Sequence, residues 1–331
     1  MNTATDTELR LLIESAHRFL TDKRAEILSG AYRDTHQFSS LWRECADMGW
    51  LLTCVPAEAD GAGMDTAAAA ALLEAVGSRL LPMPVGPGVS VAALMACVKG
   101  AGERLPIVGE WLRGERLAGI VDGQFVRYAA SDVALRLSWD ANQLTVETLA
   151  ATSAGYGVDP LLPVARHAAV QHHATLACGE PVWRQYVARS RAMMLAEALG
   201  AASGALELAV EYARERTQFG RAIGANQAVK HPLANNRMAI DDARLALHDA
   251  CAAIDAAAPD SEARLLTAEL LVSEAAHATV AQAIQTHGAL GFTWECPVHF
   301  HFKRVKHIAA ALRQERDPAA ILHRLWQLSA Y

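Results

Sequence analysis

Long stretches with helical periodicity, separated by short breaks, dominate the chain from about Arg184 onward. Apolar side chains recur along them at intervals of three and four residues, and alanine at many positions allows helices to approach closely. Short connections make consecutive helices antiparallel, so the pattern predicts an antiparallel four-helix bundle over residues 184–331. The predicted helices are Met193 to Arg214, Pro232 to Ala256, Glu262 to Thr286, and Pro297 to Leu328 with a break near Asp317-Pro318.

Two other regions precede the predicted bundle. Residues 1–113 are again helical in pattern, with the Gly61-Ala62-Gly63 turn separating two of the helices. Residues 114–183 instead carry short runs of roughly alternating apolar and polar residues, with turn chemistry at Asp122-Gly123. We therefore expect a mainly α fold with a small, reduced β-domain in the middle. The runs expected to form strands are Leu117–Val121, Phe125–Tyr128, Val133–Leu137 and Leu144–Thr148.

Composition limits the classes of function. The chain has 331 residues, 52% of them hydrophobic, and can therefore bury a sizeable core. A formal net charge of -6 gives no general cationic field, which argues against nucleic acid as a partner. The six cysteines form no CxxC pair and the first residues resemble no export leader, so we expect a reduced, cytoplasmic protein. The most apolar stretches are rich in alanine and interrupted by glutamates, so we expect no membrane span.

Polar and glycine-containing motifs lie at the breaks between the predicted bundle helices. Arg216-x-Gln218-Phe219-Gly220 follows the first helix, with Gln227 a few residues later, and Gln285-x-x-Gly288-x-x-Gly291 follows the third. A guanidinium, side-chain amides and accessible glycine backbone are what a helical protein can offer to a diphosphate. The sequence therefore points to a dinucleotide-binding role. Gly288 and Gly291 also suit helix C-caps, and Phe219 equally suits an interface core.

With these motifs in this order of domains, the chain resembles the acyl-CoA dehydrogenases. The first domain agrees, because Leu41 to Trp50, Val55-Pro56 and Gly61 to Asp65 are similar to the family's N-terminal pattern. The resemblance implies FAD as cofactor and the dehydrogenation of an acyl-CoA thioester. It also implies that the FAD diphosphate and adenosine are held by the matching residues, across a subunit boundary from the flavin. Those residues are Arg216, Gln218, Phe219, Gln227, Gln285, Gly288 and Gly291.

The catalytic carboxylate that this resemblance leads one to expect is missing. The family places it on the helix after the glycine loop or on the first bundle helix, which correspond here to about Leu312 and about Ser190. Neither residue can remove an α-proton without an adjacent base. The family's flavin-binding signature also has no counterpart between Gly114 and Trp183. We therefore predict no catalytic residue in this chain.

Without this carboxylate and this flavin-binding signature, the chain resembles the short, base-lacking subunits of heteromeric α2β2 acyl-CoA dehydrogenases of bacterial steroid side-chain degradation. The stretch Gly291-Phe292-Thr293-Trp294-Glu295 is similar to theirs. The resemblance implies a homologous catalytic partner in a heterotetramer, an acyl-CoA substrate bound mainly by that partner, and electron-transfer flavoprotein as a candidate electron acceptor. The chain is then active only as part of the complex.

Two alternatives stay open at this point. A homodimer could use a relocated base, either Glu295 beyond the glycine loop or Glu197 two turns beyond Ser190, although we expect such carboxylates to be solvated with no raised pKa. A non-enzymatic scaffold would not require the diphosphate ligands. The cluster of Cys296, His299, His301 and His307 lacks the paired spacing of a zinc site, so we expect no metal.

Overall fold

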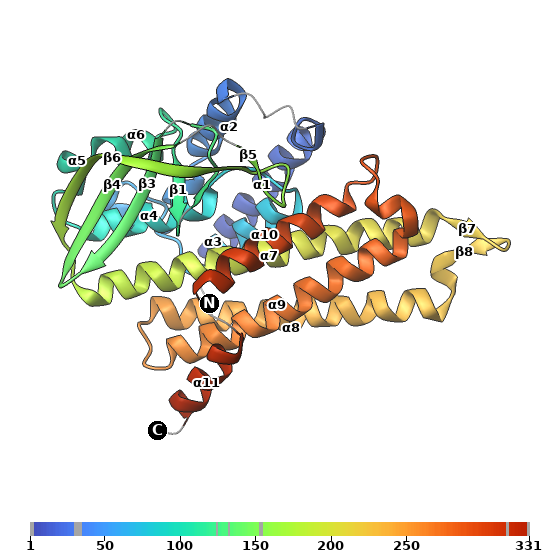
Figure 1. Cartoon of the computed structure of the whole chain (residues 1–331). Coiled ribbons are helices and arrows are strands. Elements are labelled where there is room, and N and C mark those ends of the chain that lie inside the picture. Colours follow the sequence, from blue (N-terminus) through green and yellow to red (C-terminus); the bar gives the residue numbers. More distant parts are fainter. Residues whose placement is uncertain are drawn as a thin grey trace.

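The computed structural model describes residues 3–29, 35–123, 125–131, 133–151, 155–315 and 318–329. A set of helices comes first, a six-stranded sheet follows, and a bundle of long helices completes the chain. Figure 1 shows the sheet and the first helices gathered at one end, from which the long helices extend as a rod. The expected mainly α fold with a small β-domain is confirmed.

The N-terminal helices surround a core rich in aromatic and alanine side chains. The indoles of Trp42 and Trp111 are stacked with their centroids 5.5 Å apart, and Trp42 Nε1 donates to the Trp111 carbonyl at 2.8 Å. Asp65 caps one helix by accepting from the Ala68 N–H at 2.7 Å. The elements are α1 (Thr3–Ser29), α2 (Thr35–Asp47), η2 (Trp50–Leu52), η3 (Ala57–Ala59), α3 (Thr66–Ser78), α4 (Val85–Cys97), α5 (Ala101–Arg104) and α6 (Pro106–Leu112).

The sheet has the strand order β2-β1-β3-β4-β6-β5, and an additional pairing of β2 with β6 closes it on itself. Only β1 and β3 are parallel among the paired strands of the described residues. The four runs expected from sequence correspond to β1 to β4. The long β6 was not among these four runs, because its alanines and histidines alternate weakly, although His172-His173 suggested a strand end. The strands are β1 (Gly119–Asp122), β2 (Phe125–Arg127), β3 (Val133–Asp140), β4 (Gln143–Ala151), β5 (Gly155–Tyr156) and β6 (Pro163–Ala177).

The bundle consists of four long helices and a shorter one. The second of them begins at Gln227, five residues before the predicted start, because Pro232 lies inside the helix instead of opening it. The predicted break is present, with a new helix from Pro318, while Asp317 lies outside the described residues. The elements are α7 (Glu180–Glu215), β7 (Thr217–Gln218), β8 (Arg221–Ala222), η4 (Ile223–Ala225), α8 (Gln227–Asp255), α9 (Ser261–His287), η5 (Gly288–Phe292), α10 (Val298–Glu315) and α11 (Pro318–Ser329).

The N-terminal helices pack tightly against the bundle through α3 and α7. A Cβ on Gly77 of α3 would lie 2.1 Å from the Glu197 carbonyl oxygen, and one on Gly200 of α7 would lie 2.1 Å from the Glu74 carbonyl oxygen. Only glycine permits this backbone approach. By length and composition α7 could cross a membrane, but 72% of its most apolar window is buried inside the structure, as in a core helix.

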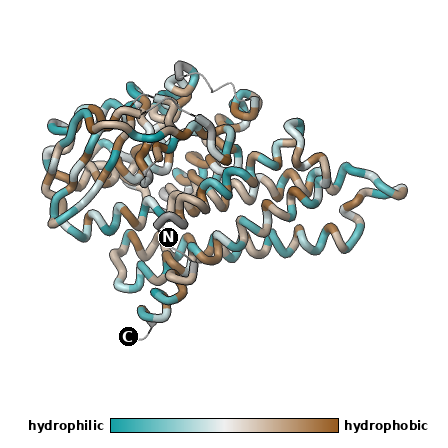
Figure 2. The backbone as a smooth tube through the Cα atoms, in the orientation of Figure 1, coloured by the Kyte–Doolittle hydropathy of each residue, from teal (hydrophilic) through white to brown (hydrophobic). Residues whose placement is uncertain are grey.

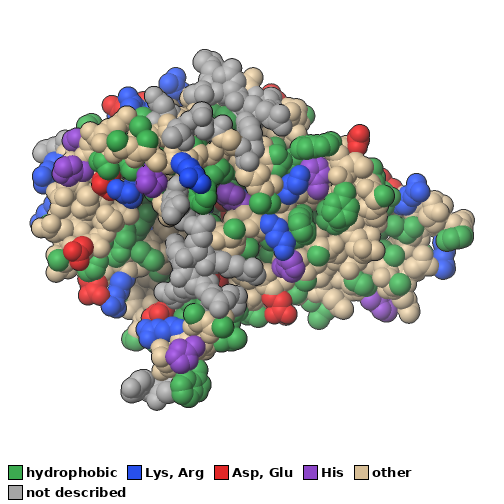
Figure 3. Space-filling model, viewed as in Figure 1, with side chains coloured by type: hydrophobic (Ala, Val, Ile, Leu, Met, Phe, Trp, Pro, Cys, Tyr) green, Lys and Arg blue, Asp and Glu red, His purple; other side chains and the backbone are tan. Residues whose placement is uncertain are grey.

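The distribution of hydrophobic and charged residues agrees with the packing of the bundle helices. Hydrophobic and hydrophilic segments alternate along the bundle helices, which bury one face of each (Figure 2). On the face shown in Figure 3, acidic, basic and hydrophobic side chains are interspersed, with no continuous basic area.

Candidate functional site

The predicted diphosphate ligands lie at the far end of the bundle, which we call the tip: the β7–β8 hairpin, the start of α8, and η5 with the end of α9. Figure 1 shows the hairpin projecting from this end. The rings of Tyr212 on α7 and His287 on α9 stack with centroids 4.5 Å apart. His287 Nδ1 also lies 2.8 Å from the Ala283 carbonyl oxygen. These contacts hold the ends of the two helices together, so the motifs after them share one end of the fold.

The hairpin turn places an aromatic ring in solvent on a strained backbone. Phe219 and Gly220 both have positive φ, 53° and 79°, as a two-residue type I′ turn requires. A non-glycine residue there is uncommon, and an aromatic one is exceptional. The Phe219 side chain is 101% exposed. Strain and exposure together are the pattern expected of a residue retained for binding.

The polar side chains of the tip are available to a ligand. Arg216, Gln218, Gln227 and Gln285 are exposed, and within the described ranges their side chains have no hydrogen-bond or ion-pair partner. Arg216 closes α7, its N–H donating to the Tyr212 carbonyl at 2.8 Å. A guanidinium and three amides fit the oxygens of a diphosphate and an adenosine.

Glycine is required at each of the two positions that follow α9, for a different local reason. Gly288 has φ 63° and ψ -139°, a conformation that side chains with a Cβ avoid, and a Cβ there would point into open space. Gly291 is buried, and its Cβ would lie 2.9 Å from the Ile284 carbonyl oxygen. Gly288 thus keeps the surface open for a ligand, whereas Gly291 allows the loop to fold onto α9.

The two positions expected for a catalytic carboxylate lie away from the tip. Leu312 of α10 is 5% exposed and lines a small cavity of about 260 Å³ between α7, α9, α10 and α11. Ser190 lies in the first part of α7 and is half-buried. The positions expected to hold the base carry an alkyl group and a hydroxyl, as the sequence indicated.

A carboxylate that sequence analysis did not consider lies beside these positions. Glu269 of α9 lines the same cavity as Leu312. Arg191, the neighbour of Ser190, binds Glu269 through two hydrogen bonds of 2.9 and 3.0 Å, and both side chains are nearly fully buried. Both carboxylate oxygens therefore face a guanidinium. No local pattern could have revealed this pair, because its members are 78 residues apart.

The expectation that Glu197 is solvated was wrong. Glu197 is 4% exposed, and Arg304 Nη1 donates to its Oε1 at 2.9 Å. Arg304 also donates to a carboxylate oxygen of Asp159 and to the carbonyls of Leu80 and Leu81, both at 3.2 Å. Burial raises the pKa of Glu197 above its ordinary value, opposed by the charge of Arg304. This buried cluster joins the segment after α3, α7, α10 and the loop before β6, which gives Glu197 a structural role.

The structure also shows the surroundings of the other candidate base, Glu295, and of the histidines considered as metal ligands. Glu295 is fully exposed, and hydrogen bonding to Thr293 lowers its pKa, as expected for a solvated carboxylate. The described residues contain no group of three His, Cys, Asp or Glu side chains able to hold a metal ion. Burial lowers the pKa of His301 to about 3 and that of His307 to about 4, so both are neutral at pH 7.

Comparisons with known proteins agree with this architecture. The models of the acyl-CoA dehydrogenase N-terminal and C-terminal domains match residues 6–104 and 179–311. The chain is 35% identical over 292 residues to "Acyl-CoA dehydrogenase IpdE2" of Mycobacterium tuberculosis, covering 86% of this chain and 85% of that protein.

Solved structures of acyl-CoA dehydrogenases share this fold. The "Tcur3481-Tcur3483 steroid ACAD" has a TM-score of 0.80 at 25% identity over 98% of both chains. Butyryl-CoA dehydrogenase from Megasphaera elsdenii has a TM-score of 0.80 at 17% identity, over 100% of this chain and 99% of that one. The chain therefore belongs to the acyl-CoA dehydrogenase family, whose cofactor is FAD.

Proposed function

We propose that this chain is the nucleotide-holding subunit of a heteromeric acyl-CoA dehydrogenase. The observation that carries the proposal is the distance between its two candidate regions. Arg216 follows Ser190 by 26 residues along α7, which corresponds to roughly 39 Å of helix. The tip therefore serves a reaction centre built by another chain. Because this chain carries no carboxylate at Ser190 or Leu312, that other chain is a different one, with its own base.

In the complex, the tip residues bind and orient one end of the cofactor. When bound, FAD supplies the acceptor for the hydride that leaves the β-carbon of the acyl thioester. Arg216 would neutralise diphosphate charge, and the amides of Gln218, Gln227 and Gln285, together with the Gly288 backbone, would offer hydrogen bonds to the cofactor's oxygens. The partner's carboxylate takes the α-proton, because neither Ser190 nor Leu312 can.

The substrate is proposed to be a bulky, steroid-like CoA thioester bound mainly by the partner. The similarity to a steroid ACAD supports the substrate class. Within this chain, α4 packs directly on α7, and a Cβ on Gly86 would lie 3.2 Å from Met193 Cβ. Val85 and Val89 of α4 are fully buried, so this helix pair offers no room for a large acyl group. Electron-transfer flavoprotein is proposed as the electron acceptor of the complex.

The proposal is tested by purifying the chain alone and together with the acyl-CoA dehydrogenase subunit that co-purifies with it from its native host. We expect stoichiometric FAD and turnover of acyl-CoA only in the mixed complex. Stoichiometric FAD with turnover in the lone chain would contradict the proposal. In that case Glu197→Gln, Glu269→Gln and Glu295→Gln identify a relocated base by the variant that loses turnover.

The variant Arg216→Ala in the mixed complex distinguishes the proposed cofactor sharing from a scaffold that never contacts the cofactor. Cofactor sharing predicts that the complex still assembles but loses most of its FAD. Retained FAD in an intact complex would favour the scaffold. Arg184→Ala is the matched control, because Arg184 is also an exposed α7 arginine but pairs with Glu180 at the other end of the helix.

A further inference from the structure

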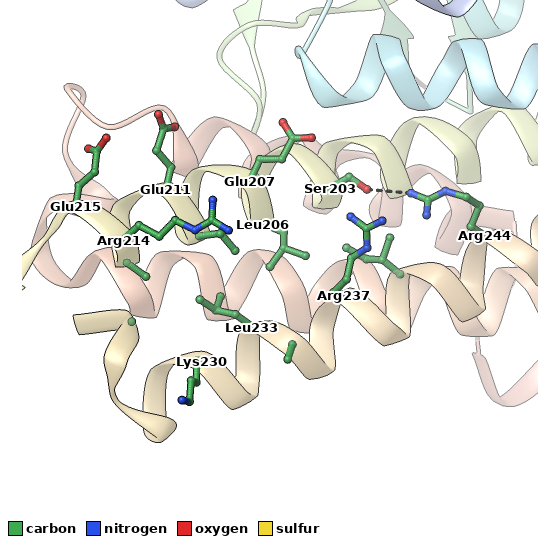
Figure 4. A pocket seen from close by; sticks show the side chains of 15 residues that line it. Ser203, Leu206, Glu207, Glu211, Arg214, Glu215, Lys230, Leu233, Arg237 and Arg244 are labelled. Atoms are coloured by element: carbon green, nitrogen blue, oxygen red, sulfur yellow. Dashed lines mark hydrogen bonds between the residues drawn. The ribbon is translucent and has the colours of Figure 1, made fainter. Parts of the chain in front are cut away.

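A groove with a cavity volume of about 840 Å³ runs between α7 and α8 next to the tip (Figure 4). Gly224 and Glu215 line its tip end, so it begins within a few residues of Arg216. Along α8 it extends from Lys230 to Arg244, which corresponds to about 21 Å of helix. Its floor is apolar and consists of Leu206, Val210, Ala213, Leu233, Ala234 and Ile240.

The two rims of the groove carry opposite charges. On α7, Glu207, Glu211 and Glu215 follow one another at intervals of four residues and so form one stripe. On α8, Lys230, Arg237 and Arg244 follow at intervals of seven residues and form another. Figure 4 shows the three glutamates on the outer side of α7, pointing away from α8, while Arg237 reaches from α8 towards α7 and Arg244 extends sideways to Ser203.

Some of these charges are already paired within the chain. Arg79 Nη1 lies 3.1 Å from Glu207, Arg237 pairs with Asp241 on its own helix at 2.9 Å, and Arg244 pairs with Glu74 at 2.8 Å. Near the tip the situation differs. In the part of the chain that the structure describes, the side chains of Glu211, Glu215, Arg214 and Lys230 have no partner.

The charge pattern selects the kind of occupant. A polyphosphate or an anionic lipid would be attracted by Arg214 and Lys230 but repelled by the row of carboxylates on α7. A second copy facing the groove would bring two concave surfaces together and leave the floor uncovered. A helix fits, because its apolar face can cover the floor while its flanks meet rims of opposite sign, as in coiled coils.

We propose that this groove receives an amphipathic helix of the partner subunit, with a basic flank facing α7 and an acidic flank facing α8. This inference rests on the proposed function, since it concerns the same heteromeric complex. It also places the partner beside the tip, because the end of the groove lies next to Arg216. The groove would thus align the partner's flavin pocket with the diphosphate ligands of this chain.

The test titrates the full-length chain with the co-purifying subunit and follows assembly by sedimentation velocity. Val210→Trp obstructs the floor, and Arg237→Glu reverses one rim charge. We expect each to weaken assembly by about tenfold or more, because the indole would clash with a docked helix and the reversed rim charge would face a like charge. Arg264→Glu, which changes a partly exposed arginine of α9 that does not line the groove, serves as the control and should leave assembly unchanged.

The double variant Glu211→Lys/Arg237→Glu distinguishes rim pairing from net charge, because its net charge equals that of the wild type. Rim pairing predicts weaker assembly than either single variant, whereas recovery to wild-type assembly would overturn the proposal. Assembly unaffected by Val210→Trp would also overturn it. Self-association of the lone chain that Val210→Trp abolishes would assign the groove to a second copy instead and reject the partner helix.

Failure of this inference is distinguishable from failure of the proposed function. If the groove variants assemble normally while Arg216→Ala still loses FAD, the groove proposal is rejected and cofactor sharing stands. If the lone chain binds FAD and turns over substrate, the proposed function is rejected whatever the groove variants do.

Discussion

The tip and the region around Leu312 lie at different places on the same bundle and have opposite character. At the tip, Arg216, Gln218, Gln227 and Gln285 are exposed and their side chains are unpaired within the described residues. Around Leu312 the polar groups are buried and engaged: Arg191 binds Glu269. Unpaired exposed groups can accept a ligand at little cost, whereas buried pairs must first be broken.

This difference indicates which part of an active centre each region can supply. The tip carries the groups that we propose bind the cofactor, and one residue there, Phe219, is held on a strained turn. Leu312 and Glu197 are instead buried, and Glu197 is held in an ion pair with Arg304, so this region contributes stability. Under the proposed function, the reacting groups are therefore supplied by the partner subunit.

The largest effect is expected on removing the cation at the centre of the buried cluster. Arg304→Met leaves Asp159 and Glu197 as buried carboxylates without their shared partner and should lower the free energy of unfolding by about 3–5 kcal/mol. Urea denaturation measures this change in the free energy of unfolding. Arg324→Met is the control, because Arg324 pairs with Glu262 on the surface and its loss should cost under about 1 kcal/mol. Equal effects of the two variants would deny the cluster its structural role.

A carboxylate restored at the family's catalytic position tests whether that region is closed. Leu312→Glu places an acidic group in a buried site and should destabilise the chain by about 3 kcal/mol, while giving no turnover of acyl-CoA in the lone chain. Leu312→Met, of similar volume, should cost under about 1.5 kcal/mol. Turnover by the lone Leu312→Glu chain would mean that a flavin and substrate pocket survives here, and the comparison between the two regions would fail.

The sequence predicted what depends on local pattern and missed what depends on distant contacts. The bundle helices and the first four strands followed from periodicity, and the candidate ligand motifs could be recognised because each is contiguous. The burial of Glu197 could not be predicted, because Arg304 lies 107 residues further along the chain. Likewise, Pro232 suggested a helix start by its local preference, yet the helix tolerates it inside and gives up one backbone hydrogen bond.

Acid should weaken the chain through histidines buried in the neutral form. Burial lowers the pKa of His307 from 6.5 to about 4, near Arg127, Asp159 and Arg304. The unfolded chain therefore takes up this proton first, so stability is complete above pH 6.5 and is lost as the pH falls towards 4. We expect His307 to account for about 2 kcal/mol of destabilisation at pH 5, measured by urea denaturation.

The contribution of His307 is isolated by substitution. His307→Gln should reduce the loss of stability between pH 7.5 and 5, whereas His231→Gln, at an exposed position on α8, should leave the loss unchanged. The same loss in both variants would show that acid acts through other groups.

The smallest effect concerns the strained turn at the tip. Asparagine followed by glycine is the preferred pair in a type I′ turn, so Phe219→Asn should stabilise the lone chain by about 0.5–1 kcal/mol. If the ring is kept for binding, the same variant should release FAD faster from the mixed complex, which flavin fluorescence can follow. Phe292→Asn is the control, because Phe292 is also exposed but has no positive φ, and it should bring no gain in stability. A stabilised Phe219→Asn chain with unchanged FAD release would mean that the strain serves no cofactor contact, and the tip would then resemble an ordinary exposed hairpin.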